Sequence, residues 1–271
     1  MRLFVPPEDI RKRHAIILSA EKSHYLLHVL RAGKGDRFTA IDGEGGAYPA
    51  EISDILRQGS SGQASPTGGP ALLAVIEIRG EPTTDVEGPS GLVLCQGLLK
   101  GEKMDLVVQK ATELGVSEIQ PLVTERSIVR QTRKVPRWRK IAEEAAEQCG
   151  RTTVPALHEP QALTAFLAAR ASLPGVMLWE HGGLPLSEAL AQLNIAPPSR
   201  HTAGAAAGPV RSRDMLAVIV GPEGGLSASE VTEARSRGFL LVTLGSRTLR
   251  AETAAIVGVA LTQYILEHGR P

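Results

Sequence analysis

What is scarce in this sequence already excludes several classes of protein. The 271 residues include two cysteines, and aromatic side chains make up only 3% of the chain. Cys95 and Cys149 lie far apart in apolar or helical contexts, so we interpret them as reduced packing residues and not as a disulfide framework or a metal site. The formal net charge is +1, which indicates no global affinity for polyanions, so any basic surface must be local.

Long apolar runs are also missing. A membrane-spanning helix needs about eighteen or more consecutive apolar residues, and no such run occurs. The first residues lack the apolar core of a secretory signal. We therefore expect a cytoplasmic protein with no membrane partner. With 42% hydrophobic residues, the chain can bury a sizeable core in one domain or two.

Several familiar catalytic motifs are absent. The sequence has no G-x-x-x-x-G-K-[ST] phosphate loop and no G-x-S-x-G nucleophile turn. No G-x-G-x-x-G follows the first strand of the α/β region, which argues against a dinucleotide oxidoreductase. His24 and His28 are four residues apart on one expected helix, but no third ligand lies nearby, so we expect no metal.

The hydrophobic periodicity changes along the chain and predicts two domains. Up to residue 80 the pattern is short strands with turns, interrupted by one helix over Glu21–Leu30. Small β-rich units of this kind often form barrels that carry RNA-binding surfaces. After Gly91 strands alternate with helices, which predicts a mostly parallel sheet covered on both faces. We place the boundary in Gly80–Gly91, giving domains 1–80 and 81–271.

The expected elements follow from these periods and from turn residues. The expected strands are Arg2–Val5, Ala15–Leu18, Arg37–Asp42, Ala47–Ile55, Leu72–Ile78, Leu92–Gly97, Glu118–Val123, Val176–Trp179, Leu216–Val220 and Phe239–Leu244. The expected helices of the second domain are Glu102–Leu114, Pro136–Cys149, Ala162–Ala171, Leu186–Leu193, one beginning near Ser227, and Ala254–Leu266. Two tracts rich in small residues, Arg57–Pro70 and Pro197–Asp214, are predicted to be a loop and an insertion.

Two glycine turns follow neighbouring strands near the C-terminus. Gly221–Gly225 comes directly after a buried strand, and Ser227–Glu230 has the spacing of a capping box that starts a helix. Gly245–Arg247 follows the next strand and precedes the last helix. Turns at the carboxyl ends of neighbouring strands are where an open α/β sheet binds its ligand. Ordinary strand-to-helix turns also use glycine, so the glycines alone leave both interpretations open.

Positive charge is concentrated locally. Between Arg126 and Arg151 the chain has eight arginines and lysines against three glutamates. The first domain adds Arg11–Arg13, and Arg31 lies near aromatic Tyr25. Basic segments can contact phosphates or can simply form a solvated face, and together they favour RNA as the partner.

Five segments in order resemble one family: Lys100–Leu122, Glu125–Ser127, Arg137–Arg151, Gly221–Glu230 and Leu244–Ala254. They are similar to the ribosomal RNA small subunit methyltransferase E family, of the SPOUT class of S-adenosylmethionine-dependent RNA methyltransferases. Arg2–Pro7 and His24–Asp36 also match, so the resemblance covers nearly the whole chain. The departures are the two tracts of small residues.

The resemblance implies a fold and an activity. The expected fold is an N-terminal PUA-like β-barrel joined to an α/β methyltransferase domain whose C-terminal segment forms a trefoil knot. The expected assembly is a homodimer with the cofactor site near the subunit interface. The expected reaction is methylation at N3 of one uridine, position 1498, in 16S rRNA of the 30S subunit.

The candidate cofactor site combines the resemblance with the two glycine turns. The expected cofactor-binding residues are Leu178, Gly221, Glu223, Gly224, Gly225, Leu244, Gly245, Leu249 and Arg250. Small residues and free backbone groups suit the adenine edge, while leucines suit its faces. The three leucines are equally compatible with core packing, and both interpretations require them to be buried.

The chemistry suggests three catalytic candidates. Uracil N3 is a poor nucleophile until it loses its proton, so a base or an anion-stabilising cation should contribute about 10²–10⁴-fold. We expect Arg250 to stabilise the developing anion and Glu223 or Glu252 to accept or relay the proton. Alternatively, Glu223 and Arg250 form an ion pair that joins the loops, and Glu252 is a helix N-terminal residue favoured by the macrodipole.

The expected RNA contacts are Arg2, Arg11, Arg31, Arg126, Arg130 and Arg151. Two other functions stay open at this point. One is a SPOUT enzyme of different specificity, for example a ribose 2′-O-methyltransferase acting on tRNA or 23S rRNA. The other is a non-catalytic RNA-binding factor in ribosome assembly.

Overall fold

The computed structural model describes residues 1–11, 15–57, 72–81, 83, 91–194 and 215–268. Most of the Arg57–Pro70 tract, the Pro197–Asp214 insertion, Lys12, Arg13 and most of the Gly80–Gly91 boundary lie outside the described residues. The chain forms two compact units. The first is Met1–Asp85 with Gly150–Thr153, and the second is Val86–Cys149 with Val154–Pro271.

The first unit is built on one five-stranded sheet. Its strands are β1 (Arg2–Phe4), β2 (Ile16–Ile17), β3 (Arg37–Ile41), β4 (Ala47–Arg57) and β5 (Leu72–Ile78), in the order β1-β3-β4-β5-β2. The β1–β3 pair is parallel and the others are antiparallel. Among the described ladders none joins β1 to β2, so strand pairing leaves the sheet open at those edges. Leu3, Leu26, Ile52 and Ile76 fill the core beneath it.

The helices of the first unit differ from expectation. α2 (Ala20–His24) continues as a π-helical turn, η1 (Tyr25–Val29), in place of one regular helix. α1 (Pro7–Arg11) was not predicted, because five residues are too few to show a helical period. It nevertheless has the expected signals of a helix start, proline in the first position and two acidic residues in the first turn.

The second unit contains one parallel sheet, which confirms the predicted fold class. Its strands are β6 (Gly91–Gly97), β7 (Glu118–Val123), β8 (Ala156–Leu157), β9 (Gln161–Ala162), β10 (Gly175–Leu178), β11 (Leu184–Pro185), β12 (Met215–Val220) and β13 (Leu240–Thr243). The order is β11-β13-β10-β12-β6-β7-β8, with β9 also on β7, and every pair is parallel. The two-residue strands β8, β9 and β11 were not predicted, since they are too short to carry a period.

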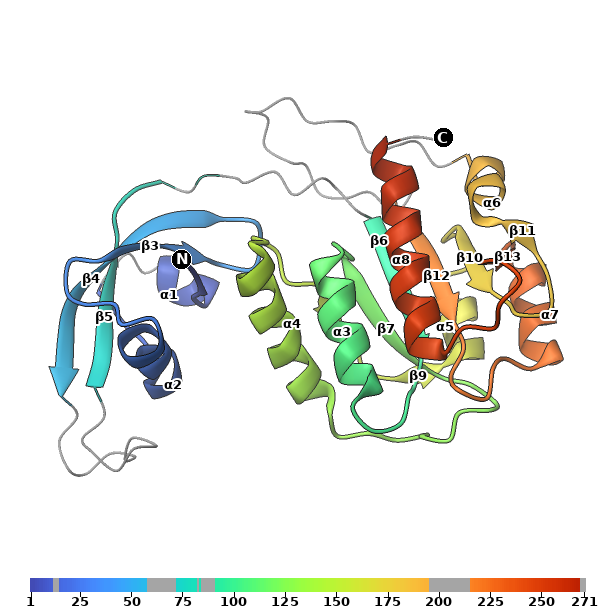
Figure 1. Ribbon diagram of the computed structural model, residues 1–271, viewed down its shortest axis with the longest axis horizontal. Coiled ribbons are helices and arrows are strands. Elements are labelled where there is room, and N and C mark those ends of the chain that lie inside the picture. Colours follow the sequence, from blue (N-terminus) through green and yellow to red (C-terminus); the bar gives the residue numbers. More distant parts are fainter. Residues whose placement is uncertain (12–14, 58–71, 82, 84–90, 195–214, 269–271) are drawn as a thin grey trace. The chain divides into compact units, whose positions relative to one another are not determined.

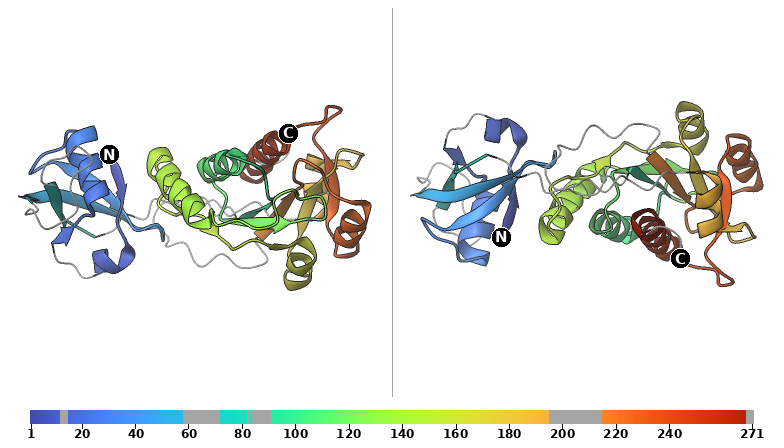
Figure 2. Two further views of the ribbon diagram at one scale, coloured as in Figure 1. Left: turned by 90° about the horizontal axis from the view of Figure 1, so that it is seen from below. Right: turned by 90° about the horizontal axis from the view of Figure 1, so that it is seen from above.

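Helices cover both faces of this sheet, as Figures 1 and 2 show. They are α3 (Lys103–Glu113), α4 (Val135–Cys149), α5 (Leu163–Ala169), α6 (Leu186–Gln192), α7 (Ala228–Ser236) and α8 (Ala251–His268). Along β6, Leu92 and Leu94 face the core under α3, α4, α6 and α8, whereas Val93 and Cys95 face the core under α5 and α7. Because this strand is buried on both faces, its sequence is a continuous apolar run.

The cysteines behave differently from each other. Burial raises the pKa of the Cys95 thiol far above its ordinary value, so it packs as a neutral apolar group. Cys149 is exposed at the end of α4, so its assignment as a packing residue was wrong.

Among the helices described, none is both long and apolar enough to cross a membrane.

Candidate functional site

Three neighbouring parallel strands end at one pocket in the second unit. β13, β10 and β12 lie side by side, and a pocket of about 320 Å³ opens at their carboxyl ends, where Leu178, Val220 and Thr243 line it. Both glycine turns line this pocket as well. The chain thus brings together two loops that are about twenty residues apart in sequence, because parallel strands end at the same edge of the sheet.

The first loop, Gly221–Gly225, is packed too closely for side chains. A Cβ built on Gly225 would lie 2.9 Å from Glu180 Oε1, and the backbone there has φ +71°, which favours glycine. Gly97, at the end of β6, has the same role on the other side, since its Cβ would lie 2.6 Å from the Pro222 nitrogen. The loop therefore keeps its shape through close backbone contact.

The predicted capping box is confirmed, and it has a second use. The Ser227 hydroxyl accepts a hydrogen bond from the Glu230 N–H, and Glu230 Oε2 accepts one from the Ser227 N–H at 2.9 Å. Glu230 Oε1 accepts a further bond from the Glu125 N–H at 2.8 Å. This buried carboxylate ties the segment that carries Arg126 to the start of α7, beside the first loop. Arg126 in turn donates to the Gly224 carbonyl at 3.4 Å.

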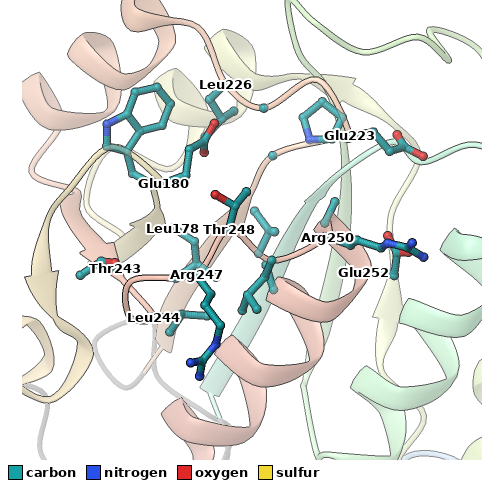
Figure 3. Close-up of a pocket in the computed structure, with 18 of the residues that line it drawn as sticks. Leu178, Glu180, Glu223, Leu226, Thr243, Leu244, Arg247, Thr248, Arg250 and Glu252 are labelled. Atoms are coloured by element: carbon teal, nitrogen blue, oxygen red, sulfur yellow. The ribbon is translucent and has the colours of Figure 1, made fainter.

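The second loop, Leu244–Arg250, joins β13 to α8. Gly245 has φ +116°, and its N–H donates to Thr243 Oγ1 at 3.3 Å. Leu178 is buried beneath this loop, and Gly258 of α8 admits it, because a Cβ there would lie 2.8 Å from Leu178 Cδ1. Figure 3 shows Leu178 and Leu244 together on one side of the pocket. These leucines form an apolar wall, and the loops offer backbone donors and acceptors at its edges.

Charged groups gather on the other side of the pocket, where Figure 3 shows Glu223, Arg250 and Glu252. Glu223 Oε1 accepts from the Lys100 N–H at 3.0 Å and lies 3.3 Å from Lys103 Nζ. The same ammonium lies 3.6 Å from Glu252 Oε2. Lys103 therefore bridges the carboxylate of the first loop and that of Glu252, in the first turn of α8 directly after the second loop.

The alternative of a Glu223–Arg250 ion pair is not found in the part of the chain that the structure describes. Lys103 takes the cationic position next to Glu223, and the Arg250 side chain is exposed at the pocket. Burial works to raise the pKa of the Glu223 carboxyl, but the Lys100 N–H and the Lys103 ammonium outweigh it and hold the pKa below its ordinary value. Glu223 is thus a stable carboxylate at neutral pH and a weak proton acceptor.

All of the expected cofactor residues except Gly224 line the pocket. Gly224 faces away, since its Cβ would lie 2.9 Å from the Arg126 carbonyl oxygen. The sequence assigned no role to several other lining residues, among them Lys103, Trp179, Glu180, Thr243 and Arg247. Their positions at a strand end, or inside the matching segments, were the available signals.

The six expected RNA-binding arginines have unequal environments. Arg31, Arg126 and Arg130 are exposed, and Arg130 donates to the Glu125 carbonyl at 2.9 Å. Arg151 is 9% exposed and donates to Thr153 Oγ1. Arg2 and Arg11 also have protein partners.

Arg2 donates to the Gly150 carbonyl, and Arg11 pairs with Glu44 at 2.6 Å on the surface. His24 and His28 have ring centroids 4.9 Å apart. Within the described ranges, no three histidine, cysteine or acidic side chains lie close enough together to hold a metal ion.

Comparison with known proteins follows the same division. A family described as RNA methyltransferase domain matches residues 86–263, and one described as RNA methyltransferase PUA domain matches residues 18–58. The chain is 32% identical to ribosomal RNA small subunit methyltransferase E of Synechocystis sp., over 98% of this chain and 78% of the relative. It is 26% identical to the Bacillus subtilis protein of the same name, over 96% of this chain and 94% of the relative.

Two solved structures of similar proteins match the chain over nearly its whole length. The crystal structure of a ribosomal RNA small subunit methyltransferase E from Neisseria gonorrhoeae bound to S-adenosyl methionine has TM-score 0.77 and 30% identity, covering 97% of both chains. A Legionella pneumophila methyltransferase in complex with the same cofactor has TM-score 0.75 and 28% identity, covering 97% of this chain and 96% of that one. From these matches across both units, the chain belongs to the ribosomal RNA small subunit methyltransferase E family.

Proposed function

We propose that this protein transfers the methyl group of S-adenosylmethionine to N3 of one uridine, position 1498, in 16S rRNA of the small ribosomal subunit. The observation that carries the proposal is the pocket itself. Two glycine loops meet at three parallel strand ends, with an apolar wall on one side and Arg250, Glu223 and Glu252 on the other. The names of the relatives support rRNA as the substrate class, and the ligands of the solved neighbours support the cofactor.

The residues present fit S-adenosylmethionine. Leu178, Leu244 and Leu249 offer apolar contacts for the adenine faces, and the loop backbones offer hydrogen bonds for its edge. Glu180 and Glu223 provide negative charge for a cationic ligand. The bound cofactor supplies an electrophilic methyl group on a sulfonium. The protein's part is to orient it and the uracil in line, which makes the transfer step effectively unimolecular.

The charged side of the pocket suggests a division of roles. Arg250 is exposed at the pocket and is suited to stabilise the negative charge that develops on the uracil oxygens. Glu252 is the second candidate to accept or relay the proton, because its Oε2 makes no hydrogen bond among the described residues and lies 3.6 Å from the Lys103 ammonium. Glu223 is already held as an anion and anchors the first loop. Lys103 is a positioning residue that sets the spacing of the two loops.

We further propose that residues 1–80 are an RNA-binding domain and 81–271 the methyltransferase domain. Arg31, Arg126 and Arg130 are exposed and bond to no carboxylate or side chain among the described residues, so they are best suited to phosphates. Arg2 and Arg151 are less exposed and have protein partners, and the exposed Arg11 is paired with Glu44. The knotted C-terminal segment and the homodimer stay predictions that rest on family resemblance, and the cytoplasmic location stays a prediction from the sequence.

The test is methyl transfer from labelled S-adenosylmethionine to 30S subunits that lack the modification, followed by mass analysis of nucleosides. We expect 3-methyluridine at one site. Label in a 2′-O-methyl nucleoside would support methyltransferase activity but contradict methylation at uridine N3. Cofactor binding without transfer to 30S subunits, tRNA or 23S rRNA would instead favour a non-catalytic assembly factor.

A further inference from the structure

The second helix of the first unit, α2 with its π-helical turn η1, ends irregularly. The Leu30 N–H donates to the Tyr25 carbonyl at 2.9 Å, which closes a π-helical turn, and the Ala32 N–H donates to the Leu26 carbonyl at 3.0 Å. Between these bonds Arg31 has φ +55°, in the left-handed region. π-helical turns are rare and are frequent at functional sites, so this helix end is a candidate for a role besides folding.

Arg31 occupies a backbone position that favours glycine. The residue just past a helix end is commonly left-handed, and glycine serves there because it has no Cβ. No hydrogen bond or ion pair of the Arg31 side chain is found among the described residues, and the side chain is exposed. The left-handed backbone at Arg31 caps the helix through the Ala32–Leu26 bond, whereas the guanidinium takes no part in that cap. An exposed guanidinium without a partner in this part of the protein is available to a ligand.

Three exposed side chains precede Arg31 in the chain. Tyr25 is 42% exposed, Val29 58% and Leu30 39%. Residues four and five apart share a face of a turn closed by i→i+5 bonds, so Tyr25, Val29 and Leu30 lie on one face. We call Tyr25, Val29, Leu30 and Arg31 the Tyr25 surface. In a chain with 3% aromatic residues, an exposed tyrosine six residues before an exposed arginine is a distinctive feature.

The charge around this surface selects the ligand. In the segment 24–34, HYLLHVLRAGK, Lys34 pairs with Asp54, so the Arg31 guanidinium is the cation without a partner among the described residues. That group attracts an anion. Four side chains are too few for a stable protein–protein interface, which buries about 1,200 Å² or more in total. An aromatic ring paired with a guanidinium is the arrangement that holds an unstacked base and its phosphate.

We propose that the Tyr25 surface binds one unpaired RNA nucleotide, with its base stacked on the Tyr25 ring and its phosphate on Arg31. The inference rests on the proposed RNA methylation and makes it more specific: the first unit recognises a single-stranded element of the RNA. Duplex RNA fits poorly, because its bases are already stacked within the helix.

The test uses the full-length protein and fluorescence anisotropy with a short labelled oligouridylate, at several salt concentrations, beside an RNA duplex of equal length. We expect tighter binding of the single strand. Tyr25→Ala should weaken it about tenfold, the range found for loss of one stacked base, and Tyr25→Phe should bind like the wild type. Arg31→Gly should reduce the slope of log affinity against log salt by about 0.7, the loss of one phosphate contact on a single strand.

Arg31→Gly separates a ligand-binding role from a structural one. Glycine relieves the left-handed strain, so the variant should melt about 2–4 °C higher while it binds RNA less tightly. Lys34→Ala is the matched control, because it removes a charge three residues away that pairs with Asp54 at 3.2 Å. It should leave the salt slope nearly unchanged.

Two results would overturn the inference: wild-type oligouridylate affinity and salt slope in both Tyr25→Ala and Arg31→Gly, or a preference for the duplex. Methylation of 30S subunits is measured in parallel, so that the two proposals fail separately. If the enzyme is active and both substitutions leave its oligouridylate affinity unchanged, the proposed role of the Tyr25 surface is refuted and the methylation proposal stands. An inactive protein that still loses single-strand binding in these variants refutes the methylation proposal and keeps the surface.

Discussion

Lys103→Met tests the central feature of the pocket, the ammonium that bridges the two loops. The substitution keeps a straight side chain of similar length and removes the charge. Glu223 would keep only the Lys100 N–H as a partner, and Glu252 Oε2 would lose the cation 3.6 Å away. The carboxylates would then repel each other across the pocket, and both loops should loosen.

The magnitude follows from distance and exposure. Unit charges 3.3 Å apart attract by about 5 kcal/mol at an effective dielectric constant of about 20. The lysine is 40% exposed and the two carboxylates are 21% and 12% exposed, so screening and desolvation remove most of this. A net loss of about 1–2 kcal/mol is reasonable for pairs between the exposed and buried limits. That corresponds to a decrease in kcat/KM of about 5- to 30-fold.

The assay is steady-state methyl transfer, with cofactor affinity measured by calorimetry and kcat/KM followed against pH. Without the ammonium, the pKa of Glu223 should rise toward its ordinary value, so the acid limb of the profile should move to higher pH. Lys103→Arg should recover part of the activity.

Lys110→Met is the matched control, because Lys110 lies on the same helix and pairs with Glu113 at 2.8 Å. Its kinetics should stay at the wild-type level. If Lys103→Met shows wild-type kcat/KM and an unmoved acid limb, the bridging role is refuted.

Other substitutions test single contacts. Arg250→Ala should lower kcat about 10²-fold, as for loss of one anion-stabilising group, and unchanged turnover would remove Arg250 from catalysis. Gly97→Ala places a Cβ 2.6 Å from the Pro222 nitrogen, so it should lower the free energy of unfolding by about 1–3 kcal/mol in denaturant. A variant as stable as the wild type would show that the first loop can move to make room for the methyl group. The pKa of Glu118 is lowered chiefly by its hydrogen bond with His158, so its stabilisation is present above the unfolded pKa of about 4.3 and is lost as pH falls through the folded value. Glu118→Gln should flatten this acid loss of unfolding free energy, and an unaltered pH dependence would contradict the assignment.

The sequence by itself determined the elements that depend on local pattern. Apolar runs predicted β6, β7 and β12 to within a residue at each end, since strands buried on both faces leave a continuous signal. The capping box at Ser227 fixed the start of α7, because both partners lie within one turn. Strand–helix alternation predicted the parallel sheet, and the glycine turns predicted the edge that carries the pocket.

Only the tertiary structure decided which distant residues meet. Lys103 and Glu252 are brought together by the packing of α3 beside α8, and no local period encodes a pair so far apart in sequence. Likewise, Gly150–Thr153 belong to the first unit although they follow α4 of the second, and Arg151 is buried there in place of being exposed. Local patterns report propensity and burial one element at a time, whereas sheet order and helix packing choose the partners of each charge. That is why the sequence located the pocket but did not identify the lysine that holds its two sides.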